Sequence, residues 1–129
     1  MTPPMYQRVR KLLENAGLTT GYTIQYLLWS DTGKHTDRFI VFRPNGGTPP
    51  DRDMAAEHYV MIDVISSTAD GDYAKTEADA QAIIDYIQQH PISEPCVGSI
   101  TPMSGMPSPI MTTEGRMVWR LQFACLYGE

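Results

Sequence analysis

The 129-residue sequence has little cysteine and no clustered metal ligands. Cys96 and Cys125 are far apart and belong to no C-x-x-C or Cys/His pattern. Free cysteine is among the most buried residue types. We therefore expect both to be small buried apolar residues in a reducing compartment, and neither to be a ligand or a nucleophile.

Long apolar runs and an excess of basic charge are also lacking. The longest apolar runs span a few residues, whereas a membrane-spanning helix needs about 20. The opening MTPPMYQRVRKLL has no apolar segment behind its basic residues, so it does not resemble a secretory signal. A net charge of −5 argues against a protein that neutralises a phosphate backbone. These observations favour a cytoplasmic protein with neither a membrane nor a nucleic acid as partner.

Sequence motifs for catalysis, metal binding or cofactor binding are missing too. Neither a Walker nor a dinucleotide-binding glycine pattern occurs, and no G-x-S-x-G elbow is present. His35, His58 and His90 have no metal-ligand spacing. The loop around Asp70-Gly71-Asp72 fails as a calcium site, because serine and threonine stand where its first acids belong. We expect no catalytic residue, no metal and no cofactor.

What is present is the pattern of one folded domain over residues 1–129, with 42% apolar and 19% charged residues. Helical spacing predicts a helix that Thr2 caps and Gly17 ends, with Met5, Val9, Leu12, Leu13 and Ala16 on its apolar face. A second helix begins near Asp72 or Thr76 and ends at Pro91, with Tyr73, Ala80, Ile83, Ile84 and Ile87 on one face.

Strands are predicted over 22–29, 38–43, 58–66 and 116–127, with a short one near Ile110. The first two are expected to form a hairpin across Ser30-Asp31-Thr32-Gly33. Strand 116–127 alternates, with Trp119 and Phe123 on one face and Arg116 and Arg120 opposite. This order predicts an α+β fold: a single mixed or antiparallel sheet of about five to six strands with two helices packed on one face.

One acid lies in an otherwise apolar strand. Asp63 must find a partner or shift its pKa if it is buried, and Arg43 or Arg120 on a neighbouring strand could supply the partner. A pocket in which Asp63 meets a histidine is the alternative, and it would make the protein a small enzyme with a dispersed site.

Two irregular segments stand out. Asn45-Gly46-Gly47, followed by Pro49-Pro50, opens a loop over Pro44 to about Ala56 and is better explained as a turn than as a phosphate cradle. Residues 101–115 combine proline and glycine with Met103, Met106, Ile110 and Met111, which either fold over the domain's own core or meet another protein. Two such segments without a marked active site favour assembly over catalysis.

The stretches FIVFRPNGG and YVMIDVISSTADGDYAKTEADAQAIIDYI, within Tyr6 to Leu126, resemble the tail terminator proteins of long-tailed bacteriophages. The resemblance implies a small α+β structural protein of a phage or prophage, without enzymatic activity or cofactor. Members form a hexameric ring on the tail tube, stop its polymerisation and offer the surface to which the head attaches. The implied partners are further copies of the chain, the tail tube protein and a head-completion protein, in the host cytoplasm and then in the virion tail.

We expect residues 44–53 and 101–115 to provide part of the ring or tube contact. The candidate contact residues are Arg43, Asn45, Gly46, Gly47, Met103, Met106, Ile110 and Met111. A regulatory binding module of one or two chains would fit the same elements and remains the alternative, together with the small enzyme.

Overall fold

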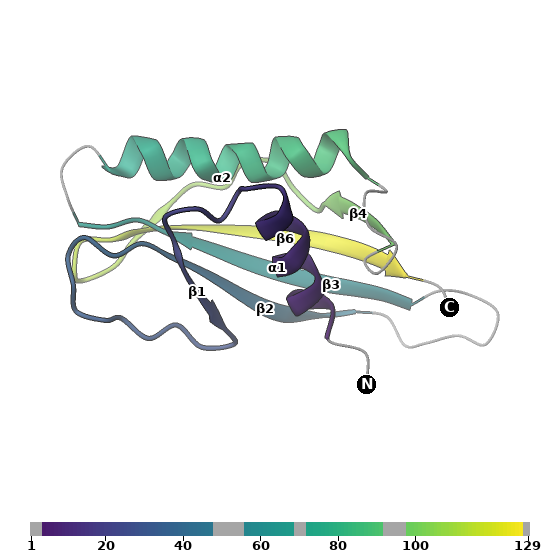
Figure 1. The fold of residues 1–129 in the computed structure, drawn as a ribbon, viewed down its shortest axis with the longest axis horizontal. Helices are drawn as coiled ribbons and strands as arrows, with labels where there is room; N and C mark the ends of the chain where they lie inside the picture. Colours follow the sequence, from purple (N-terminus) through teal and green to yellow (C-terminus); the bar gives the residue numbers. More distant parts are fainter. Residues whose placement is uncertain (1–3, 48–55, 69–71, 92–97, 128–129) are drawn as a thin grey trace.

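The computed structural model describes residues 4–47, 56–68, 72–91 and 98–127, and its elements form one α+β arrangement (Figure 1). Cys96 and the Asp70-Gly71 loop lie outside the described residues, as does Thr2, whose predicted role as the cap of the first helix is wrong because Pro4 is the N-cap. The elements are α1 (Met5–Asn15), β1 (Thr23–Tyr26), β2 (Phe39–Gly47), β3 (Ala56–Ile65), α2 (Asp72–Gln89), β4 (Ser99–Pro102), β5 (Ile110–Met111) and β6 (Met117–Tyr127). The predicted fold class is confirmed.

The sheet is mixed and has six strands in the order β1-β2-β3-β6-β4, with β5 also paired to β6. The long strands β2, β3 and β6 form antiparallel pairs at the centre. Both β4 and β5 pair with β6, antiparallel to it, so they form one edge of the sheet, while β1 forms the opposite edge.

Both helices pack on the same face of this sheet. Figure 1 shows α2 running along the length of the sheet and α1 crossing in front of β2 and β3. Alternate residues of the central strands, such as Phe42, Ile62 and Leu121, face the helices and are fully or almost fully buried. The predicted apolar faces of both helices therefore form the main core, with Leu13 and Ile83 among their contributions.

The predicted end of α1 at Gly17 is confirmed. Gly17 has φ +77°, which glycine adopts without a Cβ clash. Its amide donates to Glu14 O at 3.0 Å and the Leu18 amide donates to Leu13 O at 3.0 Å, which together form a Schellman motif.

The predicted hairpin between the first two strands is wrong. β1 pairs with β2 in parallel, with Thr23 opposite Phe39 and Tyr26 opposite Phe42. A parallel pair needs a crossover, and here residues 27–38 supply it as a strap that returns along the sheet. The strap covers a second small apolar cluster on the face that lacks helices, where Trp29 packs edge-on against Phe39.

The predicted turn at Asn45-Gly46-Gly47 is also wrong, because β2 continues through Gly47. The pairing of β2 with β3 shifts register between Pro44 and Gly47, and Gly46 has φ +84° at this irregularity. A bulge uses the same positive φ that a turn would use, which explains why the glycine pattern was ambiguous. Residues 48–55 lie outside the described residues.

Candidate functional site

The helix-free face of the sheet carries a buried carboxylate between two arginines. Asp63 is 2% exposed and lies opposite Arg120 in the β3–β6 register. It accepts from Arg43 Nη1 at 2.6 Å, and from Arg120 Nε and Nη2 at 2.9 and 3.2 Å. The carboxylate hydrogen bond raises the pKa of Arg120. Both arginine partners predicted for Asp63 are thus present, and the arrangement fixes three neighbouring strands to one another.

The other candidates near Arg43 lie at the far end of β2. The Asn45 amide donates to Gln122 Oε1 at 3.3 Å, across β3, and Gly47 pairs with His58. Gly46 helps to line a hollow of about 300 Å³ between the start of α1, the end of β2 and the start of β3. These residues belong to β2, so any contact they make with a partner is made from a strand and not from a free loop.

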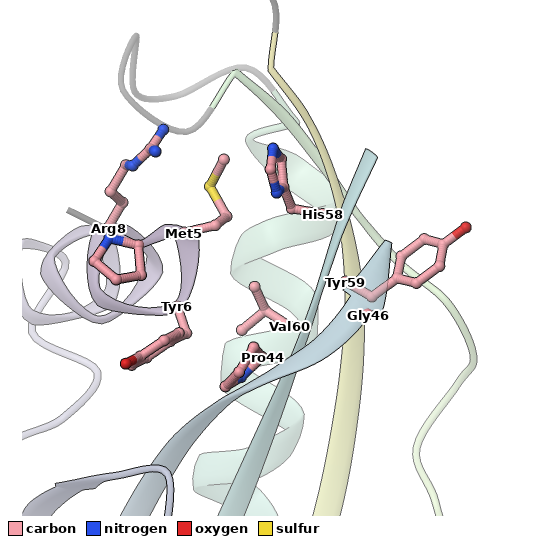
Figure 2. Close-up of a pocket in the computed structure, with 9 residues that line it drawn as sticks. Met5, Tyr6, Arg8, Pro44, Gly46, His58, Tyr59 and Val60 are labelled. Carbon is pink, nitrogen blue, oxygen red and sulfur yellow. The ribbon is translucent and has the colours of Figure 1, made fainter. Parts of the chain in front are cut away.

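Figure 2 shows this hollow, with Met5 on the side of α1 and Val60 on the side of the sheet, while the Tyr59 ring points away from it. Its lining is mainly apolar, and His58 and Arg8 bring the titratable groups on that side. Because residues alternate along β3, His58 lies on the helix face and Asp63 on the opposite face. The structure therefore does not bring Asp63 and this histidine into one pocket.

The opposite edge of the sheet carries the second group of candidates. Met103, Ile110 and Met111 are 46%, 62% and 51% exposed. Met106 differs, because it is half-buried and packs against the main core. These residues were expected either to fold over the domain's own core or to meet another protein. Met106 packs on the core, whereas the other three present apolar surface at the β4–β5 edge.

Sequence reasoning missed an exposed apolar pair at the β1 edge. Leu27 is 54% exposed and Leu28 is 78% exposed, directly after β1. Leu27 also has φ +67°, the one positive φ outside glycine in the described part of the chain. The run YTIQYLLW was interpreted as a single strand. The run of four apolar residues from Tyr26 to Trp29 breaks the alternation of a half-buried strand, and it was the one sequence signal that this strand ends early.

A buried cation was missed as well. Arg116 is 1% exposed although the alternation of β6 predicted it on the polar face. Its Nε and Nη2 donate to the Asp31 carboxylate at 3.1 and 3.2 Å, and its guanidinium also donates to the carbonyls of Lys34, Asp37 and Ser66. It therefore ties the strap to the end of the sheet, and its hydrogen bonds help to lower the pKa of Asp31 after the larger effect of the Gly33 amide.

The chemistry that the described part of the chain can offer depends in part on its metal-ligating side chains and its thiol. Among the described residues, no group of three or more His, Cys, Asp or Glu lies together as a metal site would require. Burial raises the pKa of Cys125 to about 12, so its thiol is a poor nucleophile. None of the helices in the described ranges is long and apolar enough to cross a membrane.

Comparison with known proteins identifies the family of this chain. The family model described as phage tail termination protein matches residues 2–129, so the chain belongs to that family. Membership supports a structural role in a phage tail. No curated protein sequence matches.

Two solved structures are similar to this chain to different degrees. One without a descriptive name has a TM-score of 0.56 at 9% identity, over 97% of this chain and 95% of that one. A chain in the virion of a native gene transfer agent particle has a TM-score of 0.48 at 17% identity, over 95% of this chain and 90% of the other. At these identities the first supports the fold alone.

Proposed function

We propose that the protein is a tail terminator that closes into a ring, most simply of six copies, on the end of the tail tube. The ring stops addition of further tube subunits and presents the surface to which the head joins. One observation carries the proposal beyond family membership. In the described part of the chain, five of the six exposed large apolar residues lie along the two opposite edges of the sheet, at Leu27–Leu28 and at Met103, Ile110 and Met111; the sixth, Leu126, is on β6.

Two different apolar patches on opposite edges suit a ring. A head-to-tail contact joins one patch to a different patch on the next copy and closes when the rotation between copies divides a full turn. A stable contact covers about 800 Å² per partner. The Leu27–Leu28 pair is too small for this, so neighbouring surface along each edge must take part, including the ends of β2 and the segment 101–115.

Hydrogen bonds of arginine side chains tie the β1 edge to the centre of the sheet. Arg43 and Arg120 hold β2, β3 and β6 together through Asp63, and the Arg43 Nε also donates to Leu27 O at 2.8 Å. The exposed edge is therefore coupled directly to the centre of the sheet. A rigid edge favours one rotation between copies over a range of open assemblies.

Growth of tail tubes tests the proposed function. Purified tube protein is polymerised in the presence of increasing amounts of this chain, and tube lengths are measured by electron microscopy. We expect tubes to stop growing and to carry extra density at one end only. Tubes that reach the same length with and without the chain, and whose ends stay bare, would contradict the proposal. A variant with Ile110 and Met111 both changed to serine lacks the exposed apolar side chains of β5 and should cap tubes poorly.

A further inference from the structure

We infer that residues 25–30 form a rigid apolar knuckle, with Leu27 and Leu28 at its tip, that docks against the β5 edge of a second copy of this chain. The inference deepens the proposed function and depends on it, because it assigns the central contact of the ring. It rests on the local hydrogen bonds of this segment, on its exposure and on the position of its counterpart.

The base of the knuckle is closed by one side chain. Gln25 Nε2 donates to Ser30 O at 2.9 Å, and the Ser30 amide donates to Gln25 Oε1 at 2.9 Å. The carboxamide thus pairs with the Ser30 backbone as a strand residue would. Residues 26–29 are left as a short closed loop whose shape does not depend on a partner.

The tip is fixed in an unfavourable backbone conformation. A leucine in the left-handed region is disfavoured by its Cβ, and such residues persist when surrounding contacts over-determine them. Here the Leu27 amide donates to Phe42 O at 3.0 Å, Leu27 O accepts from Arg43, and the Leu28 amide donates to Tyr26 O at 2.7 Å. These hydrogen bonds therefore hold both leucine side chains toward solvent, whereas a regular strand would place successive side chains on opposite faces.

Outward leucines gain nothing in the single chain, since Leu28 is 78% exposed. Trp29, the next residue, does turn inward and packs on Phe39. Trp29 thus contributes to the packing of this domain, whereas Leu27 and Leu28 remain exposed. Such a preorganised apolar projection loses little conformational freedom on binding, which is typical of the residues that dominate a protein interface.

The occupant is a second copy because this chain carries the matching surface where head-to-tail assembly needs it. Ile110 and Met111 are exposed, and β5 lies across the sheet from β1. β5 is only two residues long, and both of its residues are exposed beside β6. An apolar projection on one edge and exposed apolar residues on the other cannot meet within one chain, but they meet between successive copies of a ring.

Disulfide trapping tests this contact. In a Cys96→Ser background, Leu28→Cys and Ile110→Cys are introduced together and the protein is oxidised. We expect a ladder of covalently joined chains that reaches the full ring, because a disulfide forms only where Cα atoms come within about 7 Å. Leu28→Cys paired with Gln88→Cys, on the exposed side of α2, is the matched control and should give no ladder.

A second variant keeps the inference testable without crosslinking. Leu28→Ser should leave the melting temperature nearly unchanged and raise the apparent dissociation constant of the ring at least about tenfold. Ala78→Ser, at an exposed position of α2, should leave both unchanged.

The outcomes separate this inference from the proposed function. A normal ring that shows no ladder, and that tolerates Leu28→Ser, overturns the knuckle contact while the tail terminator remains. Covalent dimers from Leu28→Cys alone would show that two knuckles meet each other, which also overturns it. A wild-type chain that neither assembles nor caps tubes overturns both.

Discussion

Replacement of Arg116 by methionine should destabilise the folded chain more than replacement of any other arginine that pairs with an aspartate of this structure. The side chain is 1% exposed, donates to the Asp31 carboxylate and to three backbone carbonyls, and lies 5.0 Å from the Phe39 ring centroid. Methionine fills much of the same volume but offers no donor. The carbonyls of Lys34, Asp37 and Ser66 then lose their partner in a largely dry site.

The expected magnitude follows from the loss of a buried charge pair. Removal of one partner of such a pair costs about 3–5 kcal/mol. Since Asp31 is partly exposed and regains water, we expect the lower part of this range, about 3 kcal/mol. Urea unfolding followed by circular dichroism measures it, and the transition midpoint should fall without a large change in slope.

Arg120→Met is the matched control. Arg120 is nearly half exposed, and Asp63 keeps Arg43 when Arg120 is removed. We expect a loss of about 1 kcal/mol for this variant. If Arg116→Met and Arg120→Met lower the free energy of unfolding equally, the idea that Arg116 organises the strap is wrong.

Three further predictions concern single groups. The pKa of Asp72 is lowered to about 2, because hydrogen bonds from Arg38 and Ser67 outweigh the opposing effect of burial. The ionised Asp72 therefore contributes to the free energy of unfolding above pH about 4, and this contribution is lost as the pH falls toward 2. In urea titrations the free energy of unfolding of the wild type should fall by about 2 kcal/mol over that window, and that of Asp72→Asn should fall by less. In a Cys96→Ser background, Cys125 should react with a thiol reagent at pH 8 at least about 100-fold more slowly in the folded chain than in the denatured chain, and equal rates would show that the thiol is accessible. Gly46→Ala should lower the free energy of unfolding by about 1 kcal/mol through its positive φ alone, since an added Cβ meets nothing within 4 Å; an unchanged melting curve would show that the bulge relaxes.

The parts of the fold that depend on local pattern could be predicted from the sequence. The helical spacing of apolar residues predicted both helices, and the alternation of apolar and polar residues predicted the long strand β6. The partners of Asp63 could be predicted because a buried carboxylate in an apolar strand has few physical options, and arginine is one of them.

The parts that depend on contacts between distant residues could not be predicted. Arg116 and Asp31 are 85 residues apart, and their pairing ties the strap, whose crossover accompanies the parallel pairing of β1 with β2, to the end of the sheet. A Ser-Asp-Thr-Gly cluster between two strands suits a hairpin equally well, so local turn chemistry pointed to the wrong connection.

The candidate contact residues show the same division. Composition identified the apolar segment 101–115, and the structure places three of its residues at an exposed edge. Leu27 and Leu28 carry no such compositional signal, because their exposure results from a hydrogen-bonded closure by Gln25 that only the folded backbone reveals.

The mass of the purified wild-type protein tests the central claim most directly, which is that the two sheet edges of successive copies meet in a closed ring. Sedimentation equilibrium over a wide concentration range should give a discrete species of several chains, with six copies of 14.4 kDa amounting to about 86 kDa, and images of it should show a closed circle. A protein that stays at 14.4 kDa at the highest concentration, and does so also when finished tail tubes are added, would contradict the claim.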